Sequence, residues 1–113
     1  MKDEFYTIIE IKKNIKYFRK IIINFPKSKY ILKNNIEEYS LRLLEYTYKA
    51  NIIKEERLKY QKEIIIILKM LDYYFYLAYQ DEIINQDKYL KLAKYLINIY
   101  KYIYGWIKSE KSK

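Results

Sequence analysis

The sequence contains no cysteine and no histidine, and this limits the chemistry that the chain can perform. Without cysteine there are no disulfides and no thiol nucleophiles, and without either residue the common zinc sites cannot form. Histidine is also the side chain that most often transfers protons near neutral pH. We therefore expect no enzymatic activity, no catalytic residues, no metal and no cofactor.

Glycine and proline occur once each, as Gly105 and Pro26. A fold with many strands would need more turn residues, and a single glycine excludes a glycine-rich phosphate-binding loop. The paired carboxylates, such as Glu37 and Glu38, are expected on helix surfaces, and no glutamate lies on an apolar stripe. These features predict an all-α fold without an active site.

The length of 113 residues predicts a single domain over residues 1–113. The first residues read MKDEFYTIIEIKK, which does not match a secretory signal peptide, so we expect a cytoplasmic location. The formal charge is +9, from 23 Lys and Arg against 14 Asp and Glu. Such an excess favours polyanionic partners. The alternative is that it only keeps the protein soluble.

Hydrophobic residues recur at steps of three and four along the chain, which is the period of helices packed on one face. A first helix is expected over residues 3–25, because Pro26 disfavours helical geometry in the residue before it. A second is expected over residues 28–51, with Ser28 as its N-cap and Asn51 closing it in the left-handed conformation. The two apolar stripes are Ile8, Ile11, Ile15, Phe18, Ile22 and Phe25, and then Leu32, Ile36, Tyr39, Leu43, Tyr46 and Ala50.

Two further helices follow from the same pattern. The third is expected over residues 54–80, and the fourth after Asn85 as N-cap, with Asp87 in its first turn and a frayed polar tail from residue 109. The stripe of the fourth helix is Tyr89, Leu92, Leu96, Ile99, Ile103 and Trp106. Because the connections are short, the sequence predicts an up-down-up-down antiparallel four-helix bundle.

Residues 64–79 are apolar on every side of the third helix, with only Lys69 and Asp72 charged. One bundle can cover only part of such a helix, so we expect a homo-oligomer with this half-helix at the interface. The segment is too short and too charged to span a membrane. Tyr100 and Tyr104 are interpreted as further interface residues rather than as platforms for bases.

Lysines occupy the side of the fourth helix opposite its apolar stripe, and the first helix carries a second group of cations. Such cations can neutralise phosphates along a nucleic-acid backbone without reading its sequence, although an ordinary solvated face shows the same pattern. The first and last helices are neighbours in an up-down bundle, so we interpret both groups as one nucleic-acid-binding surface. Its candidate residues are Lys12, Lys16, Arg19, Lys20, Lys91, Lys94, Lys101 and Lys108.

Three segments together carry a resemblance to a known family: FPKSKY at residues 25–30, LAYQDEIINQDKYLKL at 77–92 and IYKYIYGWIKS at 99–109. With their spacing, they resemble Avd, the accessory variability determinant of diversity-generating retroelements, and GWIK at 105–108 is the most specific element. The related ribosomal RNA intervening-sequence proteins share the fold but usually carry glycine after the second helix. Here that turn reads YKANIIKEER, which favours Avd.

The resemblance implies a homopentamer of four-helix bundles that binds the retroelement reverse transcriptase and its template RNA or cDNA, in support of mutagenic reverse transcription. Lys101 stands at an arginine of the family pattern, which implies a nucleic-acid or partner contact there. Tyr100 and Tyr104 depart from the family glycines, and the aromatic residues 73–76 stand where arginine is common. The alternative is an oligomeric scaffold of the intervening-sequence type with no direct nucleic-acid role.

Overall fold

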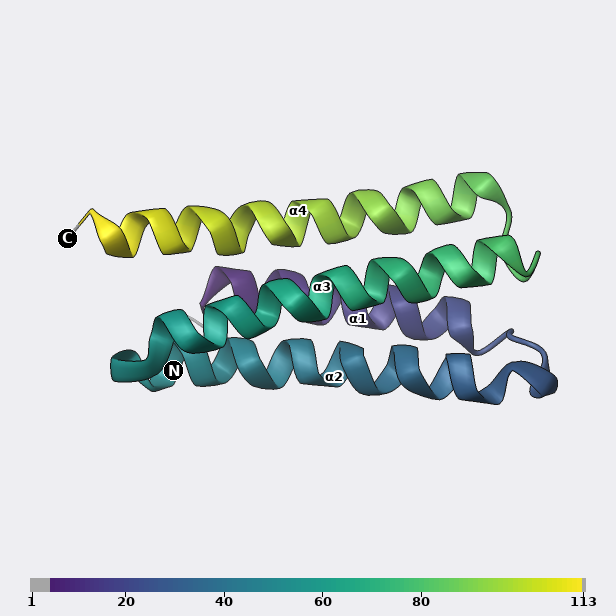
Figure 1. Ribbon diagram of the computed structural model, residues 1–113, viewed down its shortest axis with the longest axis horizontal. Coiled ribbons are helices and arrows are strands. Elements are labelled where there is room, and N and C mark those ends of the chain that lie inside the picture. Colours follow the sequence, from purple (N-terminus) through teal and green to yellow (C-terminus); the bar gives the residue numbers. More distant parts are fainter. Residues whose placement is uncertain (1–4, 113) are drawn as a thin grey trace.

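The helices of the chain lie side by side and alternate in direction, as Figure 1 shows for the computed structural model. The structure describes residues 5–112, and among these residues there is no strand, so the all-α prediction is confirmed. The elements are α1 (Tyr6–Ile22), a 3-10 turn η1 (Lys27–Lys29), α2 (Tyr30–Ile52), a second 3-10 turn η2 (Lys54–Glu56), α3 (Arg57–Gln80) and α4 (Gln86–Lys111).

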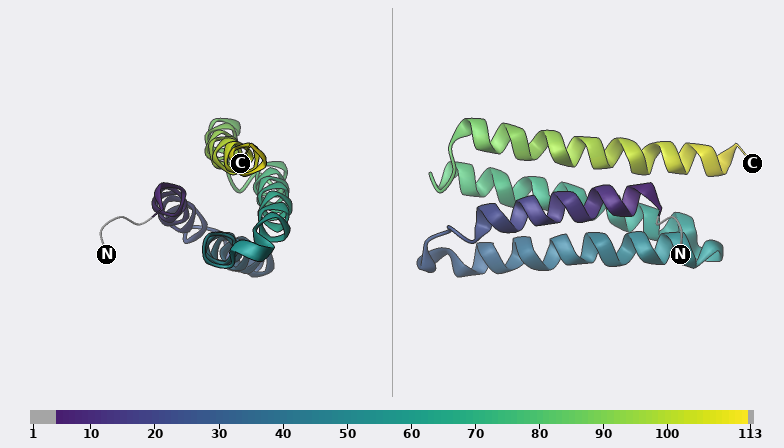
Figure 2. Two further views of the ribbon diagram at one scale, coloured as in Figure 1. Left: turned by 90° about the vertical axis from the view of Figure 1, so that its left-hand side faces the viewer. Right: turned by 180° about the vertical axis from the view of Figure 1, so that it is seen from behind.

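Each helix packs against its neighbours in sequence, and α1 also lies beside α4. Seen end on, the helices follow one another around a common centre in the order α1, α2, α3, α4 (Figure 2). The contact between α1 and α4 is the least extensive of the four. The result is a rod of 47 × 25 × 23 Å whose core runs along its length.

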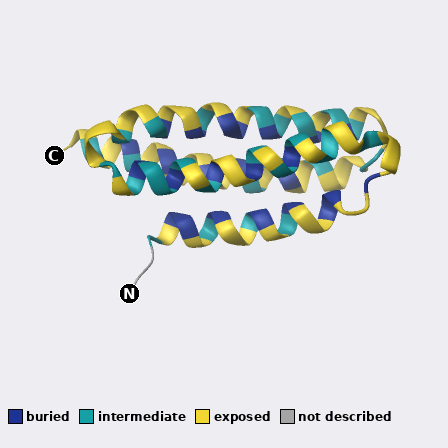
Figure 3. Ribbon diagram, turned by 90° about the horizontal axis from the view of Figure 1, so that it is seen from below, coloured by how far each residue is buried: buried dark blue, intermediate teal, exposed yellow. Residues whose placement is uncertain are grey.

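All four helices contribute to the core, and the stripes that the sequence indicates on α1 and α4 supply much of it, although Tyr89 and Trp106 of the α4 stripe are only half-buried. All six stripe residues from Ile8 to Phe25 are buried, as are Leu92, Leu96, Ile99 and Ile103 on α4. Figure 3 shows the buried positions turned toward the interior along each helix. At the centre, the rings of Phe18 and Phe75 meet edge to face with 5.1 Å between their centroids.

The core side of α2 differs from the expected stripe. Ile36, Leu43 and Ala50 are buried as expected, but the tyrosines between them are only half-buried. The fully covered positions between them are Ser40 and Thr47, whose hydroxyls donate to the carbonyls of the preceding turn at 2.7 Å. A hydroxyl that donates a hydrogen bond to a carbonyl of its own helix can be buried without another partner. α2 therefore places small side chains at the centre of the bundle.

Several helices begin or end at other residues than the sequence predicts. α1 ends at Ile22, and a turn joins it to Pro26; residues 3 and 4 of the expected first helix lie outside the described residues. Ser28 is not an N-cap, because it lies within η1 and α2 starts at Tyr30 without a side-chain cap. Asn85 is the N-cap of α4, and its side-chain oxygen accepts from the Lys88 amide at 2.8 Å. α4 continues through most of the polar tail to Lys111.

Arg57, rather than a left-handed Asn51, closes the end of α2. Its guanidinium donates to the carbonyl oxygens of Ala50 at 2.7 Å and Asn51 at 3.0 Å, which have no partners within the helix. It also pairs with Glu110 at 3.1 Å and lies 5.4 Å from the centre of the Trp106 ring. One side chain at the start of α3 therefore joins the ends of α2 and α4, which no local pattern indicates.

Replacement of Phe75 by alanine is expected to lower the free energy of unfolding by about 3–5 kcal/mol, since it leaves a cavity beside Phe18 at the centre of the core. Urea unfolding followed by circular dichroism measures this change. The matched control is Tyr30→Ala, whose side chain is 60% exposed and should change stability by no more than about 0.5 kcal/mol. Equal losses in both variants would contradict the central role of the aromatic pair.

Candidate nucleic-acid interface

Positive charge is concentrated on two neighbouring helices. α1 carries five Lys and Arg against one Glu, and α4 carries six Lys against one Asp and one Glu, so each has a net charge of +4. α2 balances three cations with three glutamates. Because α1 and α4 lie side by side, the helices that carry most of the excess charge share one side of the bundle, and this side attracts polyanions.

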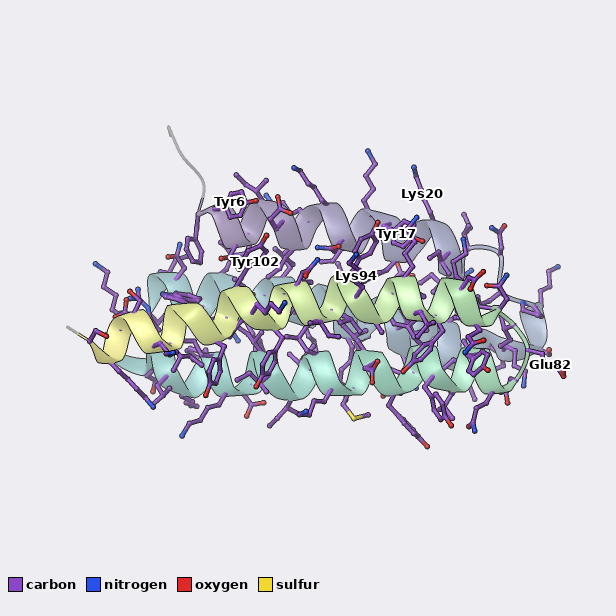
Figure 4. The ribbon with its side chains drawn as sticks, turned by 90° about the horizontal axis from the view of Figure 1, so that it is seen from above. Tyr6, Tyr17, Lys20, Glu82, Lys94 and Tyr102 are labelled. Carbon is purple, nitrogen blue, oxygen red and sulfur yellow. The ribbon has the colours of Figure 1, made fainter. Side chains whose placement is uncertain are left out.

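The lysines that the sequence places opposite the core stripe of α4 are all exposed. Lys94, Lys101 and Lys108 follow one another at intervals of seven residues, which is about 10 Å along a helix. We call these three residues the lysine row. Figure 4 shows Lys94 on the outer side of α4, directed away from the core.

Lys91 lies at the edge of the lysine row, where α4 meets α1. Its ammonium is 5.2 Å from the ring centre of Tyr17 on α1, at the distance of a cation–π contact. The Tyr17 ring in turn packs edge to face on Tyr95 at 4.9 Å. Lys91 therefore helps to join the two basic helices, and its charge remains at the surface beside the lysine row.

Aromatic side chains form the rest of the contact between α1 and α4. Tyr6 and Tyr102 meet edge to face with 5.7 Å between centroids, and Figure 4 shows them facing each other across the two helices. The pKa of Tyr6 is raised, first by its hydrogen bond with Tyr102 and then by the negative charge of Glu10. Among the ion pairs between described residues, none joins α1 to α4. The contact is therefore made without opposite charges.

The cations of α1 do not continue the lysine row. Lys12, Lys16 and Arg19 turn toward α2, where Arg19 pairs with Glu37 at 3.1 Å and the Lys12 ammonium lies 5.7 Å from the Tyr48 ring centre. Lys20 points outward from α1 (Figure 4). Lys12, Lys16 and Arg19 therefore lie on the α2 side of α1, whereas Lys20 also lines a hollow with Lys88 of α4, and a single binding surface over both helices stays a prediction.

The surface between α1 and α2 contains a cation that the sequence reasoning missed. Lys33 of α2 lines the same hollow as Lys16 and Arg19. It directly follows Leu32, so it lies at the edge of the α2 stripe, beside the neighbouring helix. Its place next to Leu32 is the only feature of the sequence that points to Lys33. It identifies this residue only if the side of α2 that contacts α1 is already known.

An apolar groove separates the lysine row from α3. Its cavity volume is about 540 Å³, and its lining includes Tyr73 and Tyr76 of α3 and Ile97 and Tyr100 of α4. Tyr100 and Tyr104 are stacked on each other at 5.7 Å rather than on the core. Ile66 and Tyr73, within the all-round apolar segment, stay more than half exposed. The segment is therefore covered on one side only, as expected for one bundle.

Two further features were sought among the described residues, a metal site and a membrane-spanning helix. Between residues 5 and 112, no group of three or more acidic side chains is placed to hold a metal ion. No helix in the same part of the chain is both long and apolar enough to cross a bilayer. The surface is thus defined by cations and tyrosines.

Comparisons with known proteins return no matching family model, no matching curated protein and no matching solved structure.

Replacement of Tyr17 by phenylalanine tests the contact between the two basic helices. The Tyr17 hydroxyl is buried without a hydrogen-bond partner among the described residues, and such a group costs about 1–3 kcal/mol. The variant should therefore be as stable as the parent or more stable by up to that amount, while Tyr17→Ala should be less stable because it loses the ring contacts. Thermal unfolding of both variants decides this, and a destabilised Tyr17→Phe would reveal a partner for the hydroxyl.

Proposed function

We propose that this protein is a non-enzymatic accessory protein that binds the backbone of RNA or DNA through the lysine row of α4. The observation that carries the proposal is the geometry of Lys94, Lys101 and Lys108, which are exposed along one side of a long helix. Phosphates are alike along every strand, so these lysines supply affinity without sequence preference. A flexible single strand laid along α4 can meet successive lysines with successive parts of its backbone.

The resemblance to Avd supports a more specific proposal about the process in which the protein acts. We propose that the nucleic acid is the template RNA or cDNA of a diversity-generating retroelement, and that the protein works with its reverse transcriptase during mutagenic reverse transcription. Lys101, at the arginine of the family pattern, belongs to the lysine row, which supports a contact at this position. The same resemblance proposes a homopentamer, in which symmetry would repeat the row around the assembly.

A second candidate function is an oligomeric scaffold without a direct nucleic-acid role. It is favoured by the exposed apolar surface of α3 and α4, where Ile66, Tyr73 and Ile97 are each more than half exposed. Contiguous exposed apolar surface of this kind is typical of association sites. The two candidates differ in one respect: only the first requires the lysine row to contact phosphates.

The double variant Lys94→Gln/Lys101→Gln should weaken binding to labelled single-stranded RNA and flatten its salt dependence. Each lost phosphate contact removes about 0.7–0.9 from the slope of log affinity against log salt, so a decrease of about 1–2 is expected. Fluorescence anisotropy over a salt series measures the slope. Lys59→Gln/Lys62→Gln on α3 is the matched control, since it removes the same charge away from α4. Equal slopes in the two double variants would show that the lysine row is only solvated.

Light scattering at micromolar concentration is expected to give the mass of an oligomer, and that of a pentamer if the family resemblance holds. Tyr73→Glu should lower this mass, because it places a charge on the apolar surface that we assign to the interface. Leu41→Glu on α2 is the control, with a side chain 49% exposed and outside the α3–α4 groove. A monomeric parent protein would refute the oligomer, and a stable dimer would refute the pentamer.

A further inference from the structure

The hollow between α1 and α2 has a different chemistry from the lysine row. Its cavity volume is about 680 Å³. Isoleucines form its floor and cations its rim. The lining residues are Ile15, Ile22 and Ile23, with Lys12, Lys16, Arg19, Lys20 and Lys33, and the single acid Glu37. Five cations against one carboxylate give the lining a net charge of +4.

Ile23 is the most unusual residue of this groove. It follows the last residue of α1, and its side chain is 68% exposed although it is aliphatic and surrounded by cations. Ile15 and Ile22 beneath it belong to the core, so the apolar surface continues from the core to the rim. An isolated exposed isoleucine would need no explanation, but this one extends the floor of a concave surface.

The cations of the rim differ in how far they are engaged. Arg19 is held by Glu37 at 3.1 Å. Among the described residues, Lys16, Lys20 and Lys33 have no carboxylate within ion-pair distance. Three ammonium groups above an apolar floor therefore remain available to an incoming acidic group.

A nucleic-acid strand matches only half of this groove. Its phosphates fit the rim, but its bases need aromatic faces for stacking, and the lining contains no aromatic residue. An amphipathic helix with an acidic polar face matches both halves, since its apolar side chains cover the isoleucines while its carboxylates meet the lysines. The lining residues of α1 run from Lys12 to Ile22, which is about 15 Å or nearly three helical turns, and Ile23 follows directly.

We propose that the groove between α1 and α2 docks an acidic amphipathic helix of a partner protein, with Ile23 as the apolar anchor and Lys16, Lys20 and Lys33 as the contacts to its carboxylates. This site is separate from the lysine row and does not depend on nucleic-acid binding there. The protein would then hold a polypeptide on one side of α1 and a phosphate backbone on α4.

The test uses an 18-residue fluorescein-labelled peptide with leucines at helical spacing on one face and glutamates on the other. The full-length protein should bind this peptide, as measured by anisotropy. Ile23→Asp should weaken binding at least tenfold, because it removes the apolar anchor and places a negative charge against the peptide. Leu90→Asp on α4 is the matched control, because the Leu90 side chain is 54% exposed and the substitution changes the charge by the same amount. The affinity of this variant for the peptide should stay within twofold of that of the parent protein. Ile23→Ser replaces Ile23→Asp if the aspartate lowers the melting temperature.

A scrambled peptide of the same composition separates docking from general attraction between opposite charges. It should bind at least tenfold more weakly than the amphipathic peptide. Equal binding of the two peptides, or parent-like affinity in the Ile23 variants, would overturn the proposal. The double variant Lys16→Gln/Lys20→Gln should lower the affinity for the peptide but leave the affinity for oligo-uridine RNA unchanged. If this variant instead loses the RNA and keeps the peptide, the groove is a phosphate site and the proposal is wrong.

Discussion

Closure of the ring between α1 and α4 is the contact on which the rest of the bundle depends. Both helices carry a net charge of +4, and an up-down bundle requires the first and last helices to close the ring. The two helices contain three acidic residues, Glu10, Asp87 and Glu110, and no ion pair between described residues joins α1 to α4. The chain closes the ring with uncharged aromatic edges, Tyr6 on Tyr102 and Tyr17 on Tyr95. Such pairs contribute about 0.5–1.5 kcal/mol each beyond the area that they bury.

The other helix contacts include ion pairs and partly buried hydrogen bonds. Arg19 pairs with Glu37 between α1 and α2, and Arg57 with Glu110 between α3 and α4. The Tyr89 hydroxyl donates to Asp72 at 3.2 Å, and burial, followed by the negative charge of Asp72, raises the Tyr89 pKa. Because the aromatic contact alone needs no acid, α4 can keep its outer side free of carboxylates between Asp87 and Glu110.

Local periodicity was sufficient to predict the elements of the fold. The stripes of α1 and α4 and the N-cap at Asn85 all follow from spacing and residue type. The missed features depend on residues far apart in sequence: Arg57 replaces Asn51 at the end of α2 because its guanidinium reaches back to two carbonyl oxygens. The exposure of the α4 lysines was predictable from their spacing alone, whereas the position of Lys12, Lys16 and Arg19 on the α2 side of α1 was not. A periodic pattern defines a face of a helix, but not which neighbour that face meets.

Gly105 lies within the exposed side of α4, between Lys101 and Lys108, and apart from its chain neighbours and the backbone of its own helix no heavy atom lies within 4 Å of the position that its Cβ would occupy. Glycine in a helix interior costs about 0.5–1 kcal/mol relative to alanine, and here neither packing nor a positive φ requires it. Its effect is a short length of uncovered helix backbone beside two cations. At this point the helix backbone itself is accessible from outside, where any larger residue would hold a bound molecule at the distance of a side chain.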